Sequence, residues 1–195
     1  MLKVFVGTDP QCGLSDRVLE NGIRKHASTD LEITWMRAGD PGFEVGESAD
    51  GSTWNIGRPA GQWFSGRGWR TDFSWFRFAV PELAGKSGRA LYLETDMIVL
   101  DDLAKLWDLP QTKPVMGSGG RYDILMFDCQ AVAEVSWWPD LQRMKRDGLD
   151  LGFYHPQLDA DGLVDLFGIP EEWKDRKSTR LNSSHSQQSR MPSSA

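Results

Sequence analysis

The chain of 195 residues has only two cysteines and three histidines, and it has fewer basic than acidic residues. Its two cysteines, Cys12 and Cys129, have no metal-type spacing, so we expect both thiols to stay reduced. Lys and Arg number 22 against 28 Asp and Glu, giving a formal net charge of −6. Such a balance argues against a nucleic-acid partner, because those proteins usually present a basic face.

Long apolar runs are lacking as well. No run approaches the length of a membrane span, so we expect no transmembrane segment. The opening residues 1–6 lack the long apolar segment of a signal peptide, which favours a cytoplasmic protein. The length suits one domain with a substantial core.

The composition changes after Lys174. Residues 175–195 are mostly Ser, Arg, Gln and Asn and offer little to bury. The blocks 175–185 and 190–195 resemble the translation of a common sequencing adapter, in its order and reading frame. We therefore expect residues 1–174 to form the domain and 175–195 to be a non-native, disordered tail, with the natural C-terminus missing.

Hydrophobic periodicity predicts alternating strands and helices. Strands are expected at 2–7, 31–36, 89–94, 115–117 and 124–127. Helices are expected at 15–26, 71–83, 102–107, 131–146 and 159–167, with a long loop over 38–70. Pro139 should break or kink the helix at 131–146. This alternation indicates an α/β sandwich with a mainly parallel sheet. In such sheets ligands bind at the carboxyl ends of the strands, where the strand order reverses.

The strand at 89–94 ends in two acids two positions apart. Side chains alternate along a strand, so Glu94 and Asp96 project to one side while Thr95 points away. Clustered carboxylate oxygens, together with ligand phosphates, suit hard divalent cations. Thr8 and Asp9, which end the first strand, would lie at the same edge of the sheet. The convergence predicts a nucleotide site with a metal on the phosphates.

Simpler explanations exist for each of these acids. Glu94 and Asp96 could cap the following turn, and Asp9 before Pro10 could be only a turn residue. Asp101 and Asp102 are expected to be N-cap and first-turn acids of the helix at 102–107.

Several segments, taken in order, carry a family likeness. The central one covers 73–83 and 88–107, and weaker ones cover 4–9, 124–129 and 158–173. Together they resemble glycosyltransferase family 8 and related bacterial GT-A glycosyltransferases. The resemblance implies a Rossmann-like GT-A fold, here incomplete at the C-terminus. It also implies metal-dependent transfer, with retention, of a sugar from a nucleotide-sugar donor (most often a UDP-sugar) to an unknown acceptor, which could be a saccharide, a lipid or a protein. The metal would be Mn²⁺ or Mg²⁺.

The same resemblance assigns roles to individual residues. Expected nucleotide-sugar contacts are Gly7, Thr8, Asp9, Arg77 and Thr95. Expected catalytic residues are Asp159, Asp161 and Arg77, with the two acids near the transferred sugar. Expected metal ligands are Glu94 and Asp96, which stand where the family has its Asp-x-Asp motif.

Two departures from the family pattern bear on function. Glu94 stands where the family usually has Asp, and the family's further metal ligand, a C-terminal histidine, has no counterpart before Lys174. Both favour an alternative function, a nucleotide-sugar or carbohydrate-binding domain without turnover. A nucleotidyltransferase of similar topology ranks lower, because the turn at 12–15 has no basic residue of the kind expected in a phosphate-binding loop.

Overall fold

The computed structural model describes residues 1–44, 72–138, 140–142, 145, 162–170 and 173. The predicted catalytic acids Asp159 and Asp161 lie outside the described residues. So do the proposed tail at 175–195 and most of the predicted loop at 38–70.

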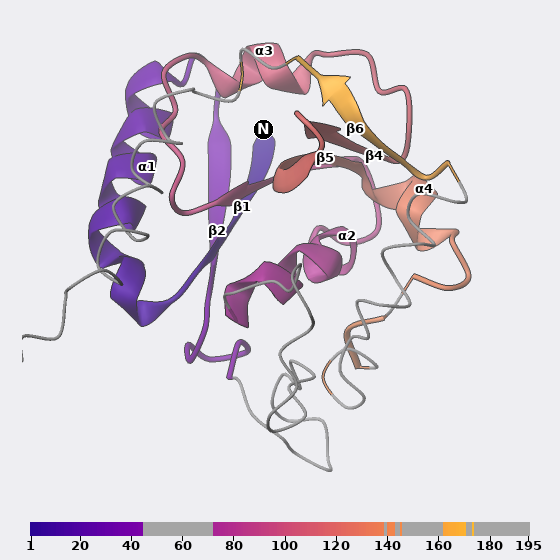
Figure 1. Cartoon of the computed structure of the whole chain (residues 1–195), viewed down its shortest axis with the longest axis horizontal. Coiled ribbons are helices and arrows are strands. Elements are labelled where there is room, and N and C mark those ends of the chain that lie inside the picture. The colour runs from indigo at the N-terminus through magenta and orange to yellow at the C-terminus, as the bar shows by residue number, and fades with distance from the viewer. Residues whose placement is uncertain (45–71, 139, 143–144, 146–161, 171–172, 174–195) are drawn as a thin grey trace, which may run out of the picture.

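A six-stranded sheet with the order β2-β1-β3-β5-β4-β6 forms the centre of the fold (Figure 1). Its strands are β1 (Leu2–Thr8), β2 (Leu31–Arg37), β3 (Arg89–Glu94), β4 (Val115–Ser118), β5 (Arg121–Asp128) and β6 (Val164–Ile169). β1 pairs in parallel with β2 and β3, and β4 pairs in parallel with β6. β5 is antiparallel to both of its neighbours. The expectation of a mainly parallel α/β sheet is confirmed.

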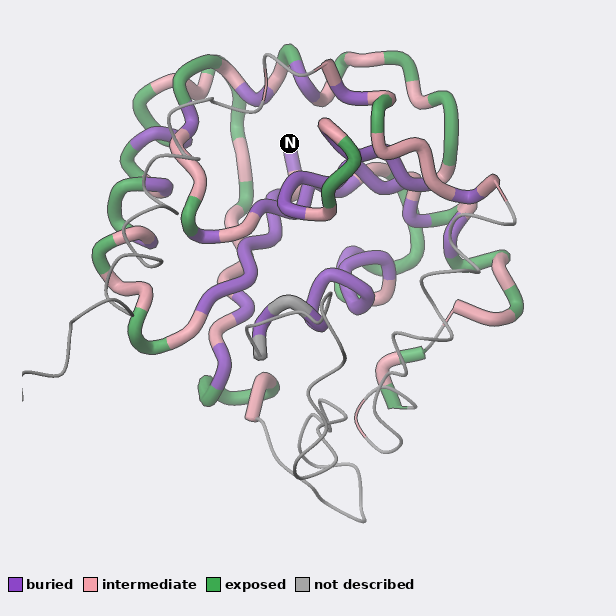
Figure 2. The backbone as a smooth tube through the Cα atoms, viewed as in Figure 1, coloured by how far each residue is buried: buried purple, intermediate pink, exposed green. Residues whose placement is uncertain are grey.

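Helices cover both faces of this sheet. They are η1 (Pro10–Cys12), α1 (Gly13–His26), η2 (Asp72–Ala79), α2 (Val80–Leu83), α3 (Leu103–Trp107) and α4 (Cys129–Ala133). Leu19 of α1 and Leu106 of α3 belong to the core on one face, and Phe76 of η2 and Val132 of α4 belong to the core on the other. Figure 2 shows β1 and β3 buried between these layers, while the outer side of α1 is exposed. Sheet burial from both sides explains why β1 and β3 are nearly continuous apolar runs.

One helix prediction was wrong, and another helix is interrupted. The segment at 159–167 contains the start of β6 rather than a helix, because Val164 pairs with Val115 on the open edge of β4. The segment 131–146 is helical at both ends but not throughout: α4 ends at Ala133, and residues 141, 142 and 145 are helical again. Beyond α4 Trp138 turns back, and its indole Nε1 donates a hydrogen bond to the Phe78 carbonyl oxygen at 2.9 Å.

A tight hairpin accounts for the reversed direction of β5. Gly119 and Gly120, with φ of 59° and 72°, form the two-residue loop between β4 and β5. Two successive positive φ angles are what a type I′ hairpin turn needs, and glycine adopts them without strain. As a result, the first residues of β5 lie at the same edge of the sheet as the carboxyl ends of the parallel strands.

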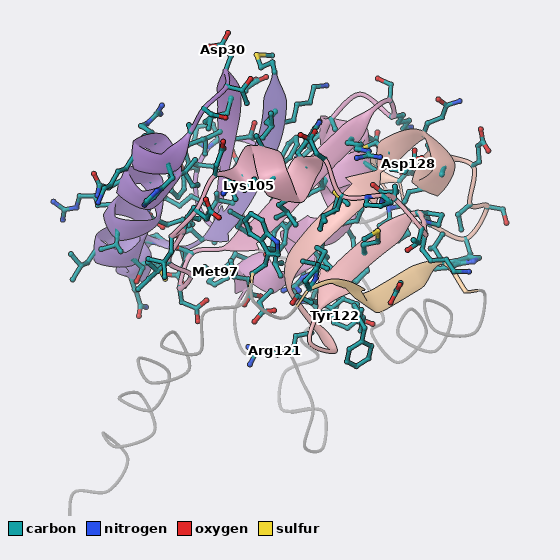
Figure 3. All side chains as sticks on the ribbon, turned by 90° about the horizontal axis from the view of Figure 1, so that it is seen from above. Asp30, Met97, Lys105, Arg121, Tyr122 and Asp128 are labelled. Carbon is teal, nitrogen blue, oxygen red and sulfur yellow. The ribbon has the colours of Figure 1, made fainter. Side chains whose placement is uncertain are left out.

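This edge is also where the strand order reverses. β1 has β2 on one side and β3 on the other, so the connections that follow β1 and β2 lead to opposite sides of β1. Figure 3 shows Met97, Arg121 and Tyr122 at one end of the strands and Asp30 and Asp128 at the opposite end. Met97 directly follows the acidic pair, so the predicted site lies at the switch point where α/β sheets bind ligands.

Candidate functional site

The structure brings the ends of β1 and β3 together. Gly7 is the register partner of Glu94, and the Thr95 amide donates a hydrogen bond to the Gly7 carbonyl oxygen at 3.3 Å. Predicted nucleotide contacts and predicted metal ligands are therefore neighbours across two parallel strands. Gly7 has little room for a side chain, since a Cβ there would lie 3.1 Å from Tyr92 Cζ and 3.2 Å from Phe73 Cδ2.

Arg77 is the buried cation of this site. The side chain comes from η2 and is 1% exposed. Its guanidinium forms an ion pair with Glu94 Oε1 and donates a hydrogen bond to the Tyr122 carbonyl oxygen. Its Cζ also lies 5.0 Å from the centroid of the Tyr92 ring, a cation–π distance. Arg77 thus links Glu94, at the end of β3, to the backbone of Tyr122, at the start of β5.

Burial raises the pKa of the Glu94 carboxyl. Burial is the largest cause that raises its pKa, Arg77 opposes that effect, and the negative charges of Asp96 and Asp123 raise the pKa further. Its side chain is 17% exposed and faces the same side of the sheet as Arg77. The carboxylates of Asp96 and Asp123 therefore lie near Glu94, and clustered carboxylates are groups that can bind a cation.

Asp123 is a third acid at this edge that the sequence patterns did not reveal. It lies on β5 one position beyond the Leu93–Ile124 pair, which places it opposite Glu94. The residue is 9% exposed, and its Oδ2 lies 3.0 Å from Arg121 Nε. Its buried Oδ1 has no hydrogen-bond partner among the residues that the structure describes. Only the hairpin that reverses β5 brings it here, so periodicity along the chain carried no signal for it.

Thr8 and Thr95 point away from this acidic face. Both are buried, and both hydroxyls donate to Oδ1 of Asp16 in α1, at 2.6 Å from Thr8. Arg37, the last residue of β2, pairs with Asp16 Oδ2 at 2.7 Å. The structure therefore gives both threonine hydroxyls a protein partner, while their nucleotide contact stays a prediction. Asp16 was missed, although it precedes buried Leu19 by three positions on the inner side of α1.

Asp9 has the turn role that was its simpler explanation. It is the N-cap of η1, and its Oδ1 accepts a hydrogen bond from the Gln11 amide at 2.8 Å. Its carbonyl oxygen accepts from Arg37 at 3.4 Å. A contact between Asp9 and a nucleotide stays a prediction.

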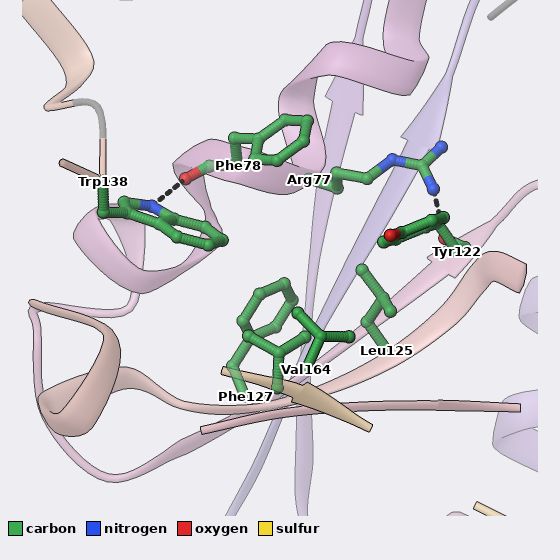
Figure 4. A pocket seen from close by; sticks show the side chains of 8 residues that line it. Arg77, Phe78, Tyr122, Leu125, Phe127, Trp138 and Val164 are labelled. Atoms are coloured by element: carbon green, nitrogen blue, oxygen red, sulfur yellow. Dashed lines mark hydrogen bonds between the residues drawn. The ribbon is translucent and has the colours of Figure 1, made fainter. Parts of the chain in front are cut away.

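A small apolar pocket opens beside Arg77 on the same face of the sheet (Figure 4). It is lined by Arg77, Phe78, Val115, Tyr122, Leu125, Phe127, Trp138 and Val164. The only charged group in this lining is the Arg77 guanidinium. The pocket supplies apolar surroundings that strengthen the Arg77–Glu94 attraction.

The predicted metal ligands have suitable donor atoms, but in the described ranges they do not form a group of three. Glu94 and Asp96 offer the carboxylate oxygens that Mn²⁺ and Mg²⁺ accept. However, Oε1 of Glu94 is held by Arg77. Within the described ranges, no group of three or more His, Cys, Asp or Glu side chains is placed to hold a metal. In the same ranges, no helix is long and apolar enough to cross a membrane.

The chain is similar to known proteins in sequence and in structure. No family model matches the sequence. "Protein CDI" of Arabidopsis thaliana is 32% identical over 111 residues, which are 57% of this chain and 38% of that protein.

Three solved structures are similar over most of the chain. The bifunctional glycosyltransferase WbbM in its apo form gives a TM-score of 0.56 at 11% identity, covering 95% of this chain and 44% of WbbM. The glycosyltransferase GlyE of Streptococcus pneumoniae gives 0.55 at 11% identity, covering 96% and 49%. The galactosyltransferase LgtC, in complex with donor and acceptor sugar analogues, gives 0.50 at 16% identity, covering 85% and 72%.

The chain spans less than half the length of Protein CDI, WbbM and GlyE. At these identities the structural likeness establishes the fold and leaves the reaction to be argued from the site. The fold is that of the GT-A glycosyltransferases, as the sequence predicted.

Proposed function

We propose that the chain is part of a glycosyltransferase that takes a sugar from a nucleotide diphosphate donor, with a UDP-sugar as the first candidate. The observation that carries the proposal is the acidic pair Glu94 and Asp96 at the switch point of a GT-A sheet, with the buried Arg77 guanidinium against it. Acids and a cation at this place suit a ligand that carries both a diphosphate and a metal. The donor and acceptor analogues bound to LgtC support the same substrate classes.

Each residue would have a distinct task. Gly7 and Asp9, at the end of β1, would contact the nucleoside, and Asp96 would hold the metal. Bound Mn²⁺ or Mg²⁺ would act as a Lewis acid on the departing diphosphate. Arg77 would offset the charge of Glu94, and so reduce the repulsion between this acidic edge and the incoming phosphates. Glu94 would then serve first as the partner of Arg77 and second as a metal ligand.

Three parts of the proposal rest on the family resemblance. Asp159 and Asp161 would orient the transferred sugar or stabilise its oxocarbenium character. Transfer would proceed with retention at the anomeric carbon. The acceptor would be a saccharide, a lipid or a protein.

Product analysis tests the reaction. The chain is incubated with a panel of UDP-sugars and Mn²⁺, released UDP is measured, and the anomeric configuration of the product is read by NMR. We expect UDP release that chelation stops and that Asp96→Asn abolishes. The matched control is Asp101→Asn, which removes an exposed acid that pairs with Lys105 and should leave release unchanged. Release that Asp96→Asn leaves intact would refute the metal role.

The alternative, a nucleotide-sugar-binding domain without turnover, has one observation in its favour. Oε1 of Glu94 is already paired with Arg77, which reduces its availability to a metal. Calorimetry with UDP, with and without Mn²⁺, separates binding from no binding. Binding of a UDP-sugar with no UDP released over hours would favour the alternative.

A further inference from the structure

One buried carboxylate joins the carboxyl ends of three strands. Asp16 Oδ1 accepts hydrogen bonds from Thr8, the last residue of β1, and from Thr95, which directly follows β3. Asp16 Oδ2 pairs with Arg37, the last residue of β2. The Asp16 side chain is 7% exposed and both threonines are buried, so the two hydroxyl contacts are shielded from water, whereas the Arg37 side chain is 28% exposed.

Buried, charge-assisted contacts of this kind are stiff. Hydrogen bonds to a carboxylate are about twice as strong as those between neutral groups. Breaking one would leave part of a buried charge without a partner, which is costly. Asp16 also lies in the first turn of α1, where the helix dipole favours a negative charge. The carboxylate therefore fixes the spacing between the ends of these strands.

That spacing matters because the two central strands serve different parts of the proposed donor. Asp9 follows Thr8 directly, and Glu94 and Asp96 flank Thr95. The nucleoside would lie at the end of β1 and the diphosphate at the end of β3. Arg37 reinforces the link, since it pairs with Asp16 and also donates to the Asp9 carbonyl oxygen.

We propose that Asp16 is a positioning residue that sets the distance between the nucleoside end and the diphosphate end of the site. The proposal rests on the proposed function. Asp16 itself lies on the α1 side of the sheet, opposite the face of Glu94, and acts through the backbone of Thr8 and Thr95. A ligand that spans both strand ends needs this spacing, whereas a ligand that contacts one end does not.

The test compares UDP, which spans both ends, with uridine, which reaches one. Thr95→Val removes one hydroxyl donor at nearly constant volume, and Asp16→Asn removes the charge that pairs with Arg37. We expect each change to weaken UDP binding by about tenfold, the loss of one hydrogen bond to a charged group. Uridine binding should change less than about twofold. Affinities are measured by calorimetry for UDP and by competition NMR for uridine, below the melting temperature of every variant.

Two further variants make the result specific. Thr95→Ser keeps the hydroxyl and should restore UDP affinity relative to Thr95→Val. Thr34→Val makes the same change on β2, at a half-buried threonine outside the Asp16 contacts, and should leave both affinities unchanged. If Asp16→Asn does not fold, the comparison of Thr95→Val with Thr95→Ser tests the proposal by itself.

Three results would overturn the proposal. Equal losses for UDP and uridine would reduce Asp16 to a purely structural residue, and unchanged affinities would remove its role altogether. In both cases the wild-type chain still binds UDP, so the proposed function stands. A wild-type chain that binds no UDP would overturn the proposed function together with the role of Asp16.

Discussion

Arg77 and Glu94 form a buried ion pair across 17 positions of sequence, linking η2 to the end of β3. The pair gives the unusual Glu94 a structural explanation. A glutamate reaches one methylene further than an aspartate, and the Arg77 guanidinium is held by Tyr122 and the Tyr92 ring at the place where Glu94 meets it. The ion pair with Arg77 therefore explains the longer side chain of Glu94 at least as well as a ligand contact does.

Shortening this acid should destabilise the protein. Glu94→Asp would withdraw the carboxylate from the Arg77 guanidinium and weaken this buried ion pair. We expect the free energy of unfolding to fall by about 1–3 kcal/mol, measured by urea denaturation. Glu20→Asp makes the same change in an exposed pair with Arg24 and should cost less than about 0.5 kcal/mol. Equal stability of Glu94→Asp and wild type would show that Glu94 serves the ligand alone.

Gly7 should tolerate no side chain while Tyr92 is present. Gly7→Ala would bring a Cβ against the Tyr92 ring and Phe73, and we expect a loss of about 1–3 kcal/mol in unfolding free energy. The Tyr92 hydroxyl is buried without a hydrogen-bond partner in the described part of the chain. Tyr92→Phe alone should therefore be neutral or stabilising.

The double variant checks the cause of the Gly7 effect. Gly7→Ala with Tyr92→Phe should recover part of the lost stability, since the hydroxyl is the nearest obstacle to the new Cβ. Gly13→Ala is the control, because a Cβ there meets nothing within 4 Å. Strict additivity of the two changes would contradict the predicted clash.

The reactivity of the Cys12 thiol should depend on the charge of Asp9. Burial, followed by the negative charge of Asp9, raises the pKa of the Cys12 thiol to about 11. The reactive thiolate is therefore scarce at pH 8 and increases as the pH rises toward 11. We expect alkylation of Cys12 by iodoacetamide at pH 8 to be about 100-fold slower than that of a free cysteine peptide.

Asp9→Asn removes one of the causes and should lower this pKa, so Cys12 alkylation at pH 8 should speed up. Cys129 is an internal control, since burial raises its pKa to about 12 and Asp9 is not among the charges that act on it. Peptide mass spectrometry follows both thiols in one sample. An unchanged Cys12 rate in Asp9→Asn would show that burial accounts for the whole effect.

The sequence predicted the strands of the switch point and the acids that end them. This succeeds because β1 and β3 are buried on both faces, so their apolar runs are long and end abruptly at polar residues. The capping role of Asp102 was also predicted, and its side chain accepts from the Ala104 amide at 2.9 Å. Local patterns suffice where a residue's role depends on its sequence neighbours.

Contacts between distant segments could not be predicted in this way. Asp123 reaches the site because a Gly-Gly hairpin reverses β5, and Asp16 contacts residues at the ends of three strands because the first turn of α1 lies there. Periodicity also failed at β6, where an apolar pattern suited both a helix and a strand and pairing with β4 decided the outcome. Strand order and direction are properties of the whole fold.

Titration of UDP into the wild-type chain and Asp96→Asn, each with Mn²⁺, tests the central claim most directly. The account predicts that the wild type binds UDP in a manner that depends on Mn²⁺. It predicts that Asp96→Asn weakens this binding by at least about 100-fold, because a direct metal ligand is lost. Equal affinity of the two proteins for UDP, or no binding by the wild type, would contradict the account.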